Sequence, residues 1–176
     1  AARLRGNTIT MRFPIAFLLA AATCATSLPG AETNLLAGVR RIVFLGDFLH
    51  AASGRTPPVL KALHDWRERH RSVTMTLVRG NHDDRAQARY ALFNMDGRTY
   101  YTFQAPAGDA RFFALETDYL KAPQVAWLEK ELASSNERWK IPYFHHPLYS
   151  SGKRHGSHTD LAAVLEALDL RRAVLA

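Results

Sequence analysis

Hydrophobic and polar positions along the chain follow two periods, one typical of strands and one typical of helices. Short runs rich in β-branched and aromatic residues cover Arg41–Asp47 and Val73–Asn81, and each ends in a glycine followed by a polar residue. Between them, Pro57–His70 begins with two prolines and repeats its apolar residues at helical spacing. This order predicts a βαβ unit whose parallel strands end at one edge of a sheet.

The second half of the chain continues the alternation of strand and helix patterns. Two strand patterns surround the turn sequence PAGDA, and a helix, a third strand and a last helix follow. The predicted ranges are Tyr100–Ala105, Arg111–Asp118, Pro123–Ser134, Trp139–Pro147 and Thr159–Leu170. The pattern as a whole therefore predicts an α/β fold.

The N-terminal region has a different composition. From Met11 the chain reads MRFPIAFLLAAATCATSLPGAE, in which one arginine, an apolar stretch over Phe13–Ala22 and small residues follow in order. This order is typical of a secretory signal peptide, with a buried helix as the alternative. The apolar stretch is shorter than the roughly 20 residues that span a bilayer, so no transmembrane anchor is predicted. We expect residues 1–31 to be upstream residues and a leader, residues 32–176 to form the domain, and the protein to be exported, periplasmic or secreted.

Charge favours an anionic substrate without indicating nucleic acid. The formal net charge is +7. Three arginines precede Glu32 and no acidic residue does, so 20 basic and 16 acidic residues remain after them, a net charge of +4. The basic residues are scattered, which gives no reason to expect specific nucleic-acid binding. A mildly basic surface suits phosphate esters as substrate.

Three of the predicted strands end in side chains that bind metals. Asp47 follows the first, Asn81 and His82 follow the second, and His145 and His146 end the strand over Trp139–Pro147. A carboxylate, an amide oxygen and imidazoles suit Mn, Fe or Zn, and such a metal activates water as a nucleophile. The alternatives are ordinary structural roles: a turn cap, a left-handed turn position and two strand-end histidines.

The same motifs carry a family resemblance. GD in VFLGDFLH, GNHD in VRGNHDD and His-His-Pro in YFHHPLYSSG resemble, in the same order, motifs of the calcineurin-like metallophosphoesterases. Residues 41–83 are similar to phosphoesterases associated with bacterial DNA ligases. Residues 90–168 are similar to exported, purple-acid-phosphatase-like phosphoesterases. The chain therefore resembles a chimera whose two parts meet at the shared GNHD.

The resemblance implies which residues bind metal. Asp47 would bridge two divalent ions, and Asn81 and His145 would bind the second of them. His145 is preferred because the family's ligand stands two residues before the proline, and His146 is a possible additional ligand.

The resemblance also implies catalytic and substrate-binding residues. His82 would stay off the metal and would stabilise the transition state or protonate the leaving group, with Asp83 orienting it. Arg154 and His155 would lie near the substrate. We expect His50 to be a surface residue.

Two motifs of the family do not occur in this sequence. The family begins with Asp-x-His on its first strand and ends with Gly-His-x-His, and neither pattern is found. The first metal would keep only Asp47, so we expect one bound metal here, whereas the family binds two.

We expect a metallophosphoesterase-like β-sandwich flanked by helices (αββα), incomplete at both ends, with exposed sheet edges that favour self-association. The predicted function is hydrolysis of phosphate monoesters by a metal-activated water. The alternatives are a phosphodiesterase or nuclease, and an inactive truncated or chimeric pseudo-enzyme that binds at most one metal.

Overall fold

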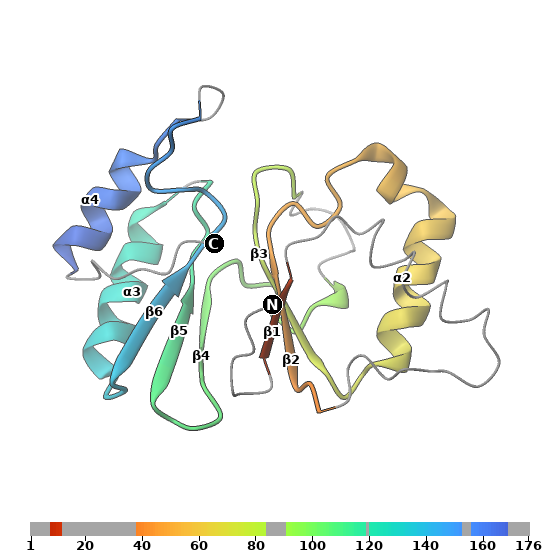
Figure 1. Cartoon of the computed structure of the whole chain (residues 1–176), viewed down its shortest axis with the longest axis horizontal. Coiled ribbons are helices and arrows are strands. Elements are labelled where there is room, and N and C mark those ends of the chain that lie inside the picture. Colours follow the sequence, from red (N-terminus) through yellow and green to blue (C-terminus); the bar gives the residue numbers. More distant parts are fainter. Residues whose placement is uncertain (1–7, 12–37, 84–90, 119, 153–155, 169–176) are drawn as a thin grey trace. The chain divides into compact units, whose positions relative to one another are not determined.

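A computed structural model describes residues 8–11, 38–83, 91–118, 120–152 and 156–168 (Figure 1). The chain divides into two compact units. Unit 1 comprises Ala1–Leu77 and His82–Asp96, and unit 2 comprises Val78–Asn81 and Gly97–Ala176. Most of the predicted leader, together with Arg154 and His155, lies outside the described residues.

Unit 1 is built on a three-stranded sheet in the order β1-β2-β3. Its strands are β1 (Thr8–Met11), β2 (Arg41–Leu45) and β3 (Thr74–Val78). β1 pairs parallel with β2, with Thr8 opposite Arg41. β2 is the central strand, and its middle residues Ile42, Val43 and Phe44 are buried. This explains the continuous apolar run in its sequence, because a central strand covered on both faces does not alternate.

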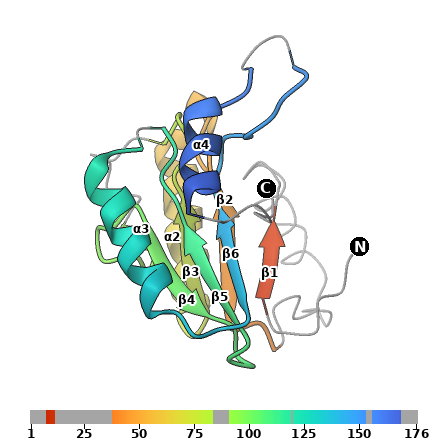
Figure 2. The same ribbon diagram turned by 90° about the vertical axis from the view of Figure 1, so that its left-hand side faces the viewer.

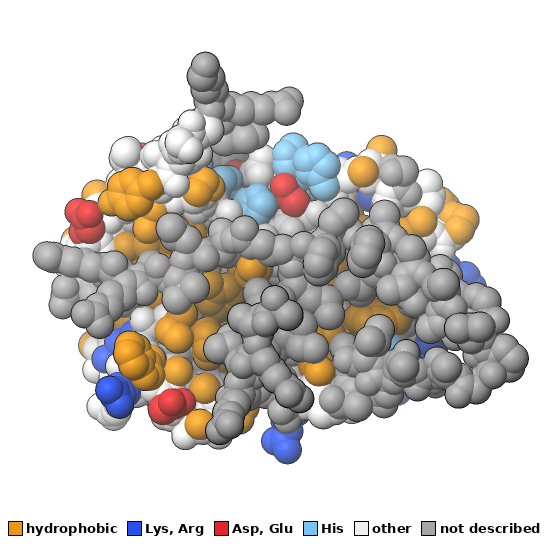
Figure 3. All heavy atoms as spheres, in the orientation of Figure 1, with side chains coloured by type: hydrophobic (Ala, Val, Ile, Leu, Met, Phe, Trp, Pro, Cys, Tyr) orange, Lys and Arg blue, Asp and Glu red, His pale blue; other side chains and the backbone are white. Residues whose placement is uncertain are grey.

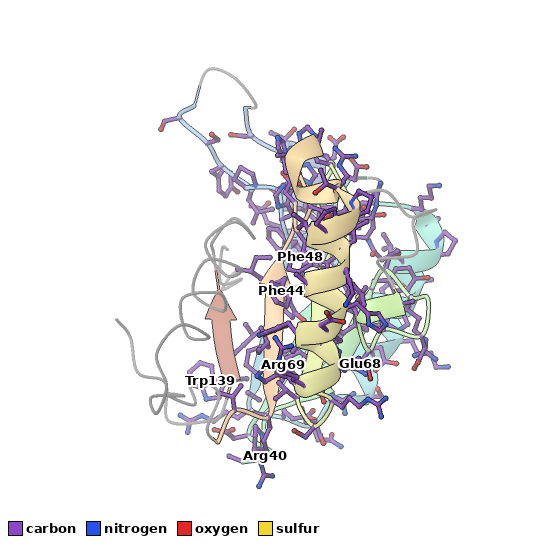
Figure 4. All side chains as sticks on the ribbon, turned by 90° about the vertical axis from the view of Figure 1, so that its right-hand side faces the viewer. Arg40, Phe44, Phe48, Glu68, Arg69 and Trp139 are labelled. Carbon is purple, nitrogen blue, oxygen red and sulfur yellow. The ribbon has the colours of Figure 1, made fainter. Side chains whose placement is uncertain are left out.

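A short 3-10 helix η1 (Ala52–Arg55) and helix α2 (Pro57–Arg69) follow β2. α2 begins at two prolines, which suit the first turn of a helix because their missing N–H groups would have no helical partner there. Three aromatic rings pack edge to face in this unit: Phe44, Phe48 and Phe93, with centroids 4.4 to 5.8 Å apart. Figure 4 shows Phe44 and Phe48 next to each other beside α2. This cluster supports the loop that leaves β2.

Unit 2 contains a second three-stranded sheet in the order β4-β5-β6. Its strands are β4 (Tyr101–Gln104), β5 (Ala110–Ala114) and β6 (Trp139–Tyr143). β4 and β5 form an antiparallel hairpin, whose turn contains Gly108 at φ 74°, while β5 and β6 are parallel. The parallel pair requires a crossover connection, and α3 (Ala122–Ser134) supplies it.

Helices α3 and α4 (Thr159–Ala167) lie against the β4-β5-β6 sheet (Figure 2). Leu128 of α3 and Leu161 and Leu165 of α4 pack in one cluster with Phe113 and Phe144. Leu128 and Phe113 are fully buried. These leucines therefore place one face of each helix in the core of unit 2.

The α/β fold predicted from the sequence is confirmed, with two sheets and three α-helices in the described residues. Every strand and helix predicted after residue 40 is present. The strands are shorter than predicted, because β2, β3, β5 and β6 each end before the polar residues that follow them. In the part of the chain that is described, no helix is long and apolar enough to span a membrane. Self-association through sheet edges stays a prediction.

A buried carboxylate connects the sheet of unit 2 to the end of α3. Glu137 accepts hydrogen bonds from the Ser135 hydroxyl at 2.6 Å, from the Gln104 amide and from Arg111 Nε at 3.0 Å. These donors, the Ser135 hydroxyl first, lower the pKa of Glu137 to about 2 and outweigh the opposing effect of desolvation. The residue therefore stays ionised to low pH.

Glu137 should make the stability of unit 2 depend on pH. A carboxyl group with a lowered pKa in the folded state stabilises the fold above its unfolded-state pKa, and this contribution is lost as the pH falls toward about 2. We expect Glu137→Gln to be less stable than the parent at pH 7 and to lose less stability between about pH 5 and pH 2. Urea unfolding at both pH values measures this. Parallel pH profiles for parent and variant would contradict it.

Candidate metal centre

The loop after β2 begins with two residues in the left-handed region of backbone space. Gly46 has φ 85° and Asp47 has φ 49°. Glycine adopts this conformation without steric cost, and aspartate is among the few other residues enriched there. Such a non-glycine position costs of order 1–3 kcal/mol and is typical of functional sites. The two residues turn the chain sharply at the end of β2 and give the Asp47 carboxylate its direction.

Both carboxylate oxygens of Asp47 have neighbours within unit 1. Oδ1 accepts a hydrogen bond from the backbone N–H of His82 at 3.1 Å. Oδ2 lies 3.5 Å from Nδ1 of His50. The Asp47 side chain is 25% exposed, so the carboxylate is held in place and still reaches solvent. The aspartate of the GD motif and the histidine of GNHD are therefore brought together within unit 1.

Two further hydrogen bonds fix the loop that carries these groups. The backbone N–H of Phe48 donates to Oδ1 of Asp83 at 3.0 Å, and Asp83 is 2% exposed. The Arg55 guanidinium donates to the backbone carbonyl of His50 at 2.9 Å. Asp83 thus connects the GNHD segment to the loop after β2, which is a different contact from the orientation of His82 that the family resemblance implies.

The imidazoles of His50 and His82 lie against each other beside Asp47. Their ring centroids are 3.9 Å apart at an interplanar angle of 65°. One donor atom from each of Asp47, His50 and His82 lies within 4.8 Å of the other two. One carboxylate and two imidazoles match the donor preferences of Zn, Mn and Fe, so the residues present fit a divalent metal ion.

In unit 2, the residue before the GNHD motif forms a buried ion-pair group. Arg79 Nη1 donates to Asp118 Oδ2 at 2.8 Å and to both oxygens of Glu116 at 3.1 Å. Burial opposes the charged form of Arg79, but these two carboxylates raise the pKa of its guanidinium. Glu116 Oε1 also accepts the backbone N–H of Asp118 at 3.0 Å. The segment after β3 is thereby anchored to the segment after β5.

His145 and His146 follow β6, and the structure assigns His146 a specific contact. Its Nδ1 lies 2.8 Å from the Thr117 hydroxyl, and its ring centroid lies 4.5 Å from that of His158. Its backbone N–H also lies 3.4 Å from the same hydroxyl. His146 therefore connects the end of β6 to the segment after β5, a role that the sequence did not indicate.

The predicted site residues fall in both units. Asp47, His82 and Asp83 belong to unit 1, whereas Asn81 and His145 belong to unit 2. Asn81 is exposed and His145 half-buried, and their role as metal ligands stays a prediction. His50 is the residue that sequence reasoning missed. The sequence feature that could have pointed to His50 is its position three residues after Asp47. An Asp-x-His motif would place the histidine one residue earlier.

Comparison with known proteins identifies the family. Residues 34–175 match the family model of calcineurin-like phosphoesterases, which covers more than half of the chain. No curated protein sequence matches the chain.

The chain also has a weak match to a solved structure. It is the crystal structure of the protein of unknown function AQ665 from Aquifex aeolicus, which is 16% identical to this chain. The alignment covers 96% of this chain and 86% of that one, with a TM-score of 0.36. A likeness at this identity and TM-score supports no statement about function.

The left-handed conformation of Asp47 predicts an unusual order of stability among its variants. Asp47→Asn should unfold at nearly the same urea concentration as the parent, because asparagine adopts positive φ readily and keeps an oxygen for the His82 N–H. Asp47→Gly keeps the backbone conformation but loses that hydrogen bond, so it should be somewhat less stable than the parent. Asp47→Ala should be about 1–2 kcal/mol less stable than Asp47→Gly, because its Cβ approaches the following carbonyl. Equal stability of the Ala and Gly variants would show that the residue does not hold this conformation.

Removal of Arg79 should destabilise unit 2 strongly. Arg79→Met keeps most of the side-chain volume and leaves Glu116, whose side chain is 4% exposed, without its cation. Loss of one partner of a buried ion pair costs about 3–5 kcal/mol. We expect a loss of this size in urea unfolding at pH 7. The control is Arg71→Met, which removes an exposed pair with Glu68 and should change stability by less than about 1 kcal/mol.

Proposed function

Because the chain belongs to the calcineurin-like phosphoesterase family, whose members hydrolyse phosphate esters with divalent metal ions, we propose that it hydrolyses phosphate monoesters. The observation that carries the proposal is the Asp47 carboxylate, held at the end of β2 with two imidazoles beside it. A divalent ion held there would supply charge neutralisation for the phosphoryl group and activation of a water as nucleophile.

The family resemblance guides the assignment of the remaining residues. In the proposal Asp47, Asn81 and His145 would hold the divalent metal. The observed contact of Asp83 supports a positioning role, because its buried carboxylate accepts the backbone N–H of Phe48 and so holds the loop that carries Asp47. His82 is placed at the site by its own backbone, which donates to Asp47.

Substrate binding in the proposal depends on positive charge near the metals. Arg154 and His155, which the resemblance places near the substrate, would contact the phosphate oxygens that face away from the metal. The net charge of +4 that remains after the predicted leader, from 20 basic and 16 acidic residues, supports an anionic substrate. Monoesters carry more negative charge than diesters at neutral pH, which is why a monoester is proposed in preference to a diester.

We also propose that the protein is exported. The support is the order of residues from Met11 to Glu32, where an arginine, a short apolar stretch and small residues follow one another. A phosphatase outside the cytoplasm would act on phosphate esters that do not cross the membrane. Cell fractionation of a tagged full chain tests this, and a tag found only in the cytoplasm would contradict it.

Activity assays test the proposed function. We expect the purified full chain to hydrolyse p-nitrophenyl phosphate when Mn²⁺ or Zn²⁺ is added, to lose this activity in EDTA, and to hydrolyse bis(p-nitrophenyl) phosphate more slowly. Asn81→Ala should weaken metal binding by at least about 10-fold. Mutation of a residue that only hydrogen-bonds to a metal ligand already lowers metal affinity by about 10- to 100-fold. The control is His64→Ala, an exposed position on α2 that should behave as the parent.

Each alternative function predicts a different result. Faster hydrolysis of the diester than of the monoester would identify the protein as a phosphodiesterase. No hydrolysis of either ester by a folded, metal-loaded chain would favour the pseudo-enzyme, which the missing Asp-x-His and Gly-His-x-His motifs suggest.

A further inference from the structure

We propose that Asp47, His50 and His82 together bind one divalent metal ion in a site that unit 1 completes without unit 2. The inference deepens the proposed function, on whose metal dependence it rests, and it assigns His50 and His82 as ligands. It also gives the first metal position the nitrogen donors that the absent Asp-x-His and Gly-His-x-His motifs would otherwise provide.

The distance between Asp47 and His50 suits two ligands of one ion. Asp47 Oδ2 and His50 Nδ1 are 3.5 Å apart. This exceeds the usual 2.7–3.2 Å of an N–H···O hydrogen bond, so the contact is a poor hydrogen bond. Two ligands bound tetrahedrally at about 2.0–2.2 Å from a zinc ion lie roughly 3.3–3.6 Å apart. The observed spacing falls in that range.

The third donor lies close enough to join them with a small side-chain rotation. All three donor atoms lie within 4.8 Å of one another, so the longest pair is at most about 1.2–1.5 Å wider than a tetrahedral edge. His50 and His82 are exposed, so their rings can turn without disturbing the core. Histidine side chains are visible at the surface of the molecule in Figure 3.

The backbone around these donors is fixed more firmly than their side chains. The left-handed turn at Gly46 and Asp47 sets the direction of the carboxylate, and the His82 N–H holds its Oδ1. Arg55 holds the carbonyl of His50. Such preorganisation lowers the entropy that binding must overcome. Within the residues that the structure describes, this is the one group of three His, Cys, Asp or Glu side chains arranged to hold a metal ion.

The arrangement leaves room for a reacting molecule. Three protein donors and an open fourth position are the usual composition of a catalytic zinc site, whereas structural sites use four protein donors. Asp47 and His50 are 25% and 55% exposed, so solvent reaches the site. Water or a phosphate oxygen would take the open position.

Cobalt titration tests the site independently of hydrolysis. Co²⁺ has visible absorption bands whose intensity reports four- or five-coordinate binding. The experiment uses the full chain carrying His145→Ala, which removes a ligand of the other proposed metal position. We expect this protein to bind one Co²⁺ with intense visible bands. His50→Ala and His82→Ala, added one at a time, should each weaken binding by about 100-fold or more, since losing only a supporting contact costs 10- to 100-fold.

A matched variant and a fold measurement control the titration. His64→Ala removes an exposed histidine of unit 1 from helix α2 and should bind Co²⁺ as its parent does. Circular dichroism should show the same helix content in all variants, because none of the substituted side chains is buried. Asp47→Asn keeps the backbone conformation and should also weaken binding.

Two results would overturn the proposal. One is a His50→Ala or His82→Ala protein that binds Co²⁺ as tightly as its parent. The other is loss of all Co²⁺ binding on His145→Ala alone, which would assign the ion to the family's second position. Unchanged Co²⁺ binding without phosphatase activity would support this metal site and contradict the proposed function.

Discussion

The turn at Gly46 and Asp47 is the constraint on which the candidate site depends. A strand that simply continued would alternate its side chains between the two faces of the sheet, and the carboxylate would point into one of them. Two successive left-handed residues instead end the ladder at Leu45 and direct the chain away from it. The conformation carries a steric cost, and the buried Asp83, through its hydrogen bond to Phe48, helps to offset it. The aromatic packing of Phe44, Phe48 and Phe93 supports the same loop from the core side.

The GNHD motif is divided between the two units, and each half has its own support. Asn81 belongs to unit 2 and follows Arg79, whose guanidinium is held by Glu116 and Asp118. His82 and Asp83 belong to unit 1 and bond to the loop after β2. A motif of four residues therefore rests on two separate sets of contacts. The buried ion pairs of Arg79 fix one set electrostatically, and backbone-to-carboxylate hydrogen bonds fix the other.

The sequence predicted the elements well because their hydrophobic patterns are local. The apolar runs of β2 and β3, the prolines at the start of α2 and the helical face containing Leu128 each carry their own signal. β1 was not predicted, because four residues of sequence TITM carry too little pattern before the apolar leader segment. The sequence also left open whether Asn81 occupies a left-handed position. Among the described residues with positive φ, the non-glycine ones are Asp47 and Asp96, so that conformation belongs to the carboxylate instead.

His50 could not be found from the Asp-x-His motif, because that motif places its histidine two residues after the aspartate, whereas His50 lies three residues after Asp47. Its position became significant only when the turn at Asp47 brought residues 47 and 50 within 3.5 Å. The role of His82 follows from the same geometry. An imidazole that binds a metal must offer a lone pair and therefore be deprotonated at the binding nitrogen, whereas a general acid must carry a proton there. If His82 Nε2 or Nδ1 ligates the ion, proton transfer to the leaving group passes to another donor or to solvent. Metal affinity of a His82 variant thus decides between two chemistries that the motif alone does not distinguish.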